Sequence, residues 1–277
     1  MDPCSAMLNN PASSTSGYEV GAVRKALEIL CQFSAAHPAH TLSDLSRSLD
    51  LPKSTAYNLL RTLERLDFLR QDPVDRRYRL GPRVFELGLL YSHKSSLVSV
   101  AYPYLRKLAD QTRETVKLGV SSNGEVLILT AIESPFQLHT RGDEGLRAAM
   151  HCTGLGKAIL ATFEDQEVSQ VIAGRGLRPL TPNTITDLDR LLVELAGIRA
   201  RGYTLDIEEN EVGVVCAAAP IADSTHRTAA ALSVSAPASR MDMTQLKACA
   251  ELVARTSKLI AASLRGPNSR RRVPQST

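Results

Sequence analysis

Apolar residues recur at helical spacing in three segments near the start of the chain. These segments span residues 20–36, 41–50 and 54–66, and Ser43 is the expected N-cap of the second. Spacings of three and four residues place such side chains on one face of a helix. Pro52, between the last two segments, cannot continue the helix before it. The pattern therefore predicts a helix followed by a helix, a tight turn and a third helix.

Two short strand-like runs follow, at residues 67–71 and 76–80. The turn between them, at residues 72–75, contains Asp and Pro, which favour turns, so the runs predict a hairpin. Gly81-Pro82 ends the hairpin, and the spacing over 84–97 predicts a connecting helix.

The rest of the chain alternates between strand and helix patterns. Asn123-Gly124 separates two alternating runs, at 114–121 and 125–133, which is a strong hairpin signal. A third strand is expected at about 136–141. Further helices are expected at 99–112, from Thr153, at 164–173, 186–201 and 241–264, and further strands at 203–208, 212–219 and 227–235. Strands that arrive as hairpins with helices between them predict an α+β fold, with an antiparallel sheet flanked by helices.

Length and composition change this picture in three ways. A chain of 277 residues with 43% apolar residues is expected to form two domains. No apolar run is long enough to cross a membrane and the N-terminus is not a secretory signal, so we expect a cytoplasmic protein with no membrane partner. The five cysteines are far apart and form no CxxC pair. We therefore expect neither a disulfide framework nor a thiolate zinc site. We also expect no other metal and no cofactor.

Charge is distributed unevenly along the chain. Residues 18–95 carry 12 Lys and Arg against 9 Asp and Glu, whereas residues 96–264 carry 17 against 19. The last thirteen residues add four arginines. This distribution is typical of a nucleic-acid-binding module joined to a domain with another task.

The third predicted helix and the hairpin have polar side chains suited to DNA. Lys53, Ser54, Thr55, Tyr57, Asn58 and Arg61 crowd the outer face of the helix, and the hairpin carries Arg76, Arg77 and Arg79. The major groove of DNA accommodates one helix, and arginines beside it can contact phosphates or the minor groove. The alternative is a generic three-helix core whose polar residues and arginines are simply solvated.

Two segments of the second domain are candidates for a ligand site. Gly154-Leu155-Gly156 opens a helix, where free N–H groups favour an anion. Ser233 and Ser235 alternate with apolar residues, so both hydroxyls project from one strand face. The alternative is that the serines lie on a solvated face and the glycines only begin a helix. Cys216 is either an apolar wall residue or a reactive thiol.

Enzyme motifs are missing from the sequence. It has no GxSxG, HExxH or GxxxxGK[ST] pattern, and TGLGKA lacks the spacing of a phosphate loop. A hydrolase that uses Ser233 or Cys152 with His151 remains the alternative, as does a small-molecule sensor with an incidental helix-turn-helix. We predict that the chain is not an enzyme.

Six blocks make the chain resemble an IclR-type transcriptional regulator from about residue 20 to 264. The first domain contains AVRKALEIL, LSDLSRSLDLPKSTAYNLLRTLERLDFL and RRYRLGPRVFELG, and the second contains HCTGLGKAILA, RGYTLDIEENEVGVVCAAAP and AALSVSAPASR. Asn58 stands where members often carry Arg, so operator preference is not transferred from the family.

The resemblance implies a DNA-binding regulator, expected to be a repressor of a catabolic or related operon. Its expected parts are a disordered leader (1–17), a winged helix-turn-helix (18–81), a linker helix (82–97), a GAF-like effector-binding domain (98–264) and a disordered basic tail (265–277). By motif, the effector pocket would contain Gly154, Leu155, Asp206, Val214, Cys216, Ala218, Leu232, Ser233 and Ser235. The expected partners are a small anionic effector, further copies of the chain in a homodimer or homotetramer, and double-stranded DNA with a pseudo-palindromic operator.

Overall fold

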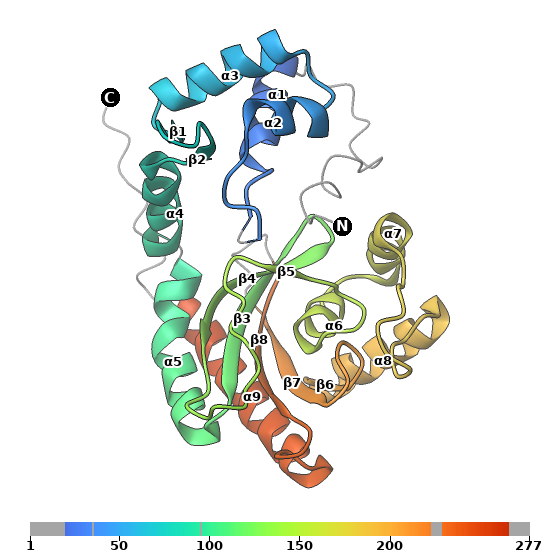
Figure 1. Ribbon diagram of the computed structural model, residues 1–277. Helices are drawn as coiled ribbons and strands as arrows, with labels where there is room; N and C mark the ends of the chain where they lie inside the picture. Colours follow the sequence, from blue (N-terminus) through green and yellow to red (C-terminus); the bar gives the residue numbers. More distant parts are fainter. Residues whose placement is uncertain (1–19, 35, 95, 223–228, 266–277) are drawn as a thin grey trace, which may run out of the picture. The chain divides into compact units, whose positions relative to one another are not determined.

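The computed structural model describes two compact units, which divide between residues 94 and 95 (Figure 1). The described residues are 20–34, 36–94, 96–222 and 229–265. The expected leader at 1–17 and the tail from residue 266 onward lie outside them.

The first unit is a helical core with a small hairpin. Its elements are α1 (Gly21–Leu30), α2 (Leu42–Ser48), α3 (Lys53–Arg65), β1 (Leu69–Gln71), β2 (Tyr78–Leu80) and α4 (Pro82–Lys94). Strands β1 and β2 pair antiparallel, so the predicted helix-turn-helix and hairpin are confirmed. The core is formed by Ile29, Leu45, Leu60, Leu63, Leu69 and Tyr78.

The helix α2 begins one residue after Thr41, and the expectation that Ser43 caps it is wrong. Thr41 Oγ1 accepts a hydrogen bond from the Asp44 N–H (3.2 Å), and the Asp44 carboxylate accepts one from the Thr41 N–H (3.1 Å). This reciprocal pair satisfies two N–H groups at once, which a cap at Ser43 would not do. The helix α1 is also shorter than expected, because it ends at Leu30.

The base of the hairpin depends on a glycine. The Gly81 N–H donates to the Phe68 carbonyl (2.7 Å), and a Cβ at this position would lie 2.1 Å from the Asp67 carbonyl oxygen. Only glycine permits that approach, which fixes β2 against the end of α3.

The second unit is an antiparallel sheet of six strands with helices on both faces. The strands are β3 (Thr115–Ser122), β4 (Glu125–Ile132), β5 (Arg147–Ala148), β6 (Thr204–Ile207), β7 (Val214–Ile221) and β8 (Ala230–Pro237), in the spatial order β5-β4-β3-β8-β7-β6. The helices are α5 (Ser96–Thr112), α6 (Gly154–Leu160), α7 (Asp165–Arg175), α8 (Leu188–Arg201) and α9 (Met243–Leu264). The predicted α+β fold is confirmed.

Alternation along the strands divides the unit into two cores. Leu232 and Val234 of β8 belong to the core that packs against α5 and α9. Ala231 and Ala218 belong to the core on the other face, which contains residues of α6, α7 and α8. Figure 1 shows α5 and α9 on one side of the sheet and α6 to α8 on the other.

The strand expected at about 136–141 does not form, and the short strand beside β4 is β5 instead. Side chains, rather than a partner strand, bond the backbone of this segment. Thr115 Oγ1 donates to the Thr140 carbonyl (2.7 Å), and the Gly142 N–H donates to the Glu133 carboxylate (2.8 Å). The segment is therefore a loop held by polar side chains, which periodicity cannot reveal.

In the part of the chain that the structure describes, none of the helices combines the length and apolar character needed to span a bilayer.

We predict that Gly156→Ala destabilises the second unit. A Cβ at Gly156 would lie 2.3 Å from the Met150 backbone, so α6 or the turn before it must move. Overpacking of this kind costs about 1–3 kcal/mol of unfolding free energy, to be measured by urea denaturation. Gly174→Ala is the control, because a Cβ there meets nothing within 4 Å and alanine favours a helix. Equal stability of the two variants would contradict this account of α6.

Candidate functional site

The outer face of α3 is a polar surface with a buried apolar back. Ala56, Leu60 and Leu63 are buried, which fixes the rotation of the helix. Of the six predicted residues, Lys53, Ser54, Tyr57, Asn58 and Arg61 are exposed and Thr55 is half-buried. The first turn of α3 contains no acidic residue and Pro52 makes no side-chain cap, so its N-terminal dipole is not neutralised locally.

The hairpin presents the predicted arginines and one that the sequence reasoning missed. Arg76, Arg77 and Arg79 are all exposed. Arg70 pairs directly with Arg79 across the hairpin, so two cations lie side by side. The alternation of side chains along the strand could have indicated that Arg70 is exposed. Its pairing with Arg79 could not be predicted, because the register between the two strands depends on the geometry of the turn.

Acidic residues balance some of these cations but not all of them. Arg79 pairs with Asp75 at 2.9 Å, and Arg61 pairs with Glu64 at 3.0 Å. Within the described residues, the side chains of Arg76 and Arg77 have no acidic partner within 4 Å. Their side chains are therefore open to a phosphate.

The second unit contains a pocket of about 890 Å³. It lies over the face of the sheet that carries α6, and the loops on either side of β5 and the loop after β6 complete its wall. This volume is in the range of small-molecule sites. Seven of the nine predicted pocket residues line it: Gly154, Leu155, Asp206, Val214, Cys216, Ser233 and Ser235.

Ala218 and Leu232 do not line the pocket, so the prediction that they belong to it is wrong. Leu232 alternates with Ser233 on β8, so it faces the core that contains α5 and α9. Ala218 is on the correct face of the sheet, but α6 covers it completely. The motif contains both residues, whereas the pleat and the packing decide which of them reach the cavity.

Strand register aligns the polar residues in two rows across the sheet. Asp206 pairs with Cys216, and Cys216 pairs with Ser235, which forms one row. Ser233 pairs with Lys117 of β3, which begins the other. Directly opposed residues point to the same face, so segments far apart in sequence converge on the pocket.

Close packing of α6 depends on glycine at its first position. A Cβ at Gly154 would lie 2.7 Å from Cys216 Sγ. Thr153 caps the helix and accepts a hydrogen bond from the Gly156 N–H (3.1 Å). One of the N–H groups that the sequence offered to an anion is therefore already used within the chain.

The hydroxyl of Ser233 is a buried donor without a partner. The residue is 1% exposed, and no described group lies in hydrogen-bonding position for its Oγ. Leaving such a group unsatisfied costs about 1–3 kcal/mol. The alternative, in which both serines lie on a solvated face, is wrong, because Ser235 is also buried.

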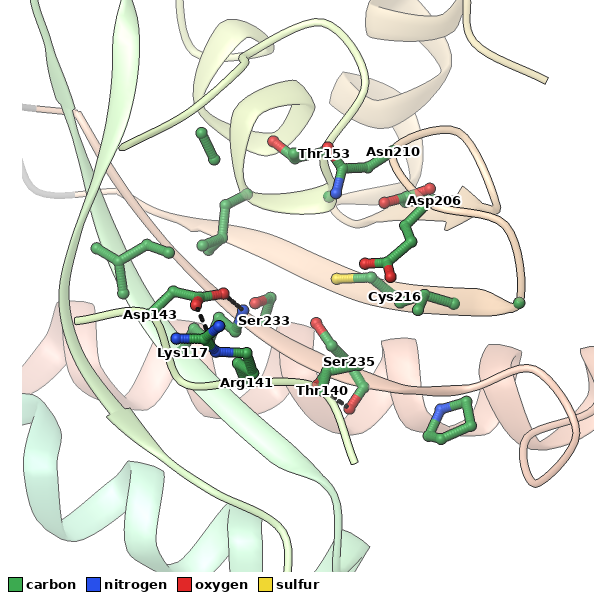
Figure 2. A pocket seen from close by; sticks show the side chains of 18 of the residues that line it. Lys117, Thr140, Arg141, Asp143, Thr153, Asp206, Asn210, Cys216, Ser233 and Ser235 are labelled. Atoms are coloured by element: carbon green, nitrogen blue, oxygen red, sulfur yellow. Dashed lines mark hydrogen bonds and ion pairs between the residues drawn. The ribbon is translucent and has the colours of Figure 1, made fainter. Parts of the chain in front are cut away.

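Asp206 is a buried carboxyl at the opposite side of the pocket, near Asn210 and Thr153 (Figure 2). Burial raises its pKa to about 7, although the Glu209 N–H donates to its Oδ1 (2.8 Å) and partly stabilises the charged form. The neighbouring Glu209 pairs with the fully buried Lys157, and burial raises the pKa of Glu209 as well. The Glu209 N–H therefore orients the Asp206 carboxyl.

The two cysteines near the pocket are poor nucleophiles. Burial raises the pKa of Cys152 to about 12 and that of Cys216 to about 11, so both remain thiols near neutral pH. The ring of His151 is hydrogen-bonded to the Arg178 carbonyl (3.0 Å) rather than to Cys152. The residues of the alternative hydrolase do not form a dyad.

A charged group that the sequence reasoning missed lies at the other end of the pocket. Lys117 Nζ is 3.3 Å from Asp143 Oδ2, and Arg141 Nε is 3.6 Å from Asp143 Oδ1. Figure 2 shows these three side chains together beside Ser233. No local pattern joins Lys117 to Asp143, because 26 residues separate them in sequence.

Over the described residues, no three His, Cys, Asp or Glu side chains gather in a way that could hold a metal ion.

Both units match known protein families. Residues 22–73 match the IclR helix-turn-helix domain, and residues 89–262 match the family described as bacterial transcriptional regulator IclR C-terminal.

Full-length relatives and solved structures agree with these matches. The chain is 33% identical over 243 residues to the HTH-type transcriptional repressor AllR of Escherichia coli K12, covering 88% of this chain and 90% of AllR. It is similar to the IclR transcriptional regulator of Alicyclobacillus acidocaldarius (TM-score 0.80, 25% identity, 89% and 99% of the two chains). It is also similar to an IclR homologue of Microbacterium hydrocarbonoxydans in complex with 4-hydroxybenzoate (TM-score 0.78, 26% identity, 88% and 99%).

We predict that Asp206 makes the stability of the second unit depend on pH. Its pKa is about 7 in the folded chain and about 3.9 in an unfolded one, so the folded state holds a proton that the unfolded state loses. Its contribution is therefore present below pH 4 and is lost as the pH rises towards 7. Relative to Asp206→Asn, the wild type should lose up to about 4 kcal/mol of unfolding free energy between pH 4 and 8.

Urea denaturation across this pH range measures the difference. Asp110→Asn is the control, because Asp110 is exposed on α5. A constant difference between wild type and Asp206→Asn would show that the carboxyl is ionised throughout.

Proposed function

Because this chain belongs to the IclR family of bacterial transcriptional regulators, we propose that a small effector held in its pocket controls how tightly it binds DNA. The chain is a transcriptional regulator with a helix-turn-helix DNA-binding domain. The observation that carries the effector proposal is the pocket itself, a cavity of about 890 Å³ that contains the buried, unpartnered Ser233 hydroxyl.

We propose that α3 reads base edges in the major groove. The Asn58 amide can pair with the edge of an adenine. Arg61 can contact a guanine or a phosphate once its ion pair with Glu64 is broken. Lys53, Ser54, Thr55 and Tyr57 lie on the same side of α3. The hairpin arginines, Arg76 and Arg77 above all, would bind phosphates or the minor groove.

The effector is proposed to be a small anionic molecule that the protein binds without transforming it. Ser233 and Ser235 supply hydroxyl donors, Lys117 supplies a cation, and the thiols near the pocket are protonated. Donors without an activated nucleophile hold a ligand and do not turn it over. The complex of the Microbacterium homologue with 4-hydroxybenzoate supports an organic acid as the ligand class.

We propose that the regulator acts as a repressor, since AllR is named as one. A homodimer or homotetramer on a pseudo-palindromic operator would supply enough base contacts to locate one site in a genome. The linker at 82–97 is the proposed connector between subunits. Its apolar side chains Phe85, Leu87, Leu89 and Leu90 are exposed in the single chain, which supports burial against a partner. The proposed domains are therefore 18–81 for DNA and 98–264 for the effector.

Asn58→Ala and Arg77→Ala should separate base reading from phosphate binding. Asn58→Ala should reduce discrimination between operator and mismatched DNA by about 1–3 kcal/mol. Arg77→Ala should weaken all DNA similarly and lower the slope of log affinity against log salt by about 0.9. Gel-shift titrations with the DNA upstream of its own gene measure both effects.

Arg255→Ala is the control, because it removes the same charge from the exposed side of α9. Unchanged affinity and selectivity for Asn58→Ala would remove Asn58 from the proposed reading surface.

Replacing both pocket serines should uncouple the DNA response from the effector. The double variant Ser233→Ala, Ser235→Ala loses the buried donors and keeps the polar face of α3. Operator binding, titrated with a panel of organic acids that includes 4-hydroxybenzoate, should then lose its response, while effector-free affinity stays within about twofold. Ser169→Ala on α7 is the control. A normal response by the double variant would show that the effector binds elsewhere.

A further inference from the structure

The pocket contains a lysine that already has a counter-ion within the chain. The side chain of Lys117 is 13% exposed, and its ammonium lies 3.3 Å from the Asp143 carboxylate. A buried cation needs a partner, so in the absence of ligand Asp143 provides the compensating charge.

Backbone contacts hold Asp143 in place independently of Lys117. Asp143 has a φ of +57°, in the left-handed region, and its carbonyl accepts a hydrogen bond from the Leu146 N–H (3.0 Å). On its two sides, the Gly142 N–H donates to Glu133 (2.8 Å) and the Gly145 N–H donates to the Ile128 carbonyl (2.8 Å). The carboxylate is thus positioned by its loop.

The contact between Lys117 and Asp143 leaves one polar group unsatisfied. Ser233 is directly opposite Lys117 in the sheet, on the same face. Asp143 reaches the ammonium, yet the Ser233 hydroxyl has no partner in the described chain. A carboxylate with one oxygen at each group would satisfy both, because it accepts from an ammonium and a hydroxyl together.

We propose that the carboxylate of the effector replaces Asp143 at Lys117 and also accepts a hydrogen bond from Ser233. Asp143 is then an internal substitute for the ligand, and the ligand class is a small monocarboxylate. This inference rests on the proposed function only in requiring that the pocket binds a small molecule.

Charge balance permits the exchange without leaving an ion unpaired. Arg141, whose side chain is 85% exposed, lies 3.6 Å from the other oxygen of Asp143. After the exchange, Lys117 pairs with the ligand and Asp143 keeps Arg141. The loop from His139 to Arg147 then loses its ion pair with β3 but keeps the hydrogen bond from Thr115 to the Thr140 carbonyl, so ligand binding removes one of the restraints on this loop.

A purely structural role for the ion pair makes a different prediction. If Asp143 only holds the loop, its removal destabilises the pocket and weakens ligand binding. If Asp143 competes with the ligand, its removal strengthens the binding of carboxylates and leaves uncharged analogues unaffected.

Calorimetric titration of the full chain separates the two roles. The probes are acetate, benzoate and 4-hydroxybenzoate, each compared with its uncharged amide. Asp143→Asn should bind at least one of these carboxylates about tenfold more tightly than the wild type, and Lys117→Met about tenfold more weakly. In the Lys117→Met background, Asp143→Asn should change affinity less than about twofold, because the cation that both anions share is gone. Amide binding should change less than about twofold in every variant.

Two exposed positions provide matched controls. Asp110→Asn on α5 and Lys247→Met on α9 make the same chemical changes away from the pocket and should leave all affinities unchanged. Thermal unfolding of each variant establishes that the chain is folded at the titration temperature.

Equal or weaker carboxylate binding by folded Asp143→Asn would overturn the proposal, and so would failure of that variant to bind any of the three carboxylates at millimolar concentration. Binding of the amides alone, with a change in operator affinity, would reject the ion exchange and the anionic effector, and would leave standing the proposal that a small molecule in the pocket controls DNA binding. If no organic acid or amide binds the pocket or alters operator affinity, both fail.

Discussion

The central strand β8 is buried along its whole length and packs on both faces, so each residue has to suit one of two different surroundings. Leu232 and Val234 fill the core against α9, and Ser233 and Ser235, which alternate with them, face the pocket. Pairing with β3 on one side and β7 on the other is then fixed, because a shift of one residue would bury the serines in the apolar core and turn the leucine towards the cavity. The position of every polar residue on the pocket floor follows from this register.

Close packing buries the polar residues at the wall of the pocket. Helix α6 packs so closely on Cys216 that a Cβ at Gly154 would lie 2.7 Å from the Cys216 Sγ. Burial also raises the pKa values of Cys216 and Asp206. Burial therefore has two effects. It keeps the thiols protonated near neutral pH, and it leaves the Ser233 hydroxyl without a hydrogen-bond partner among the described residues.

Regulation by a ligand requires a difference in affinity between two states of the protein. The group around Lys117 supplies a physical origin for such a difference, because the same cation has one partner in the chain and a better one in a carboxylate that also reaches Ser233. The polar face of α3 depends on packing within the first unit. The buried residues Leu60 and Leu63 fix the rotation of the helix and turn its polar side chains outward.

The sequence alone determined the features that depend on local periodicity and on motifs. These are the polar face of α3, the two hairpins, the alternation of Ser233 with Leu232 and the family resemblance. Tertiary structure decided what depends on contacts between distant segments. The sequence predicted a strand at 136–141, but the side chains of Thr115 and Glu133 bond the backbone of this segment and of Gly142, which is a loop. The motif placed Leu232 in the pocket, and the pleat turned it away. The side chain of Lys117 lies beside Asp143 because of the loop geometry and opposite Ser233 because of the strand register. Neither contact follows from a spacing along the sequence.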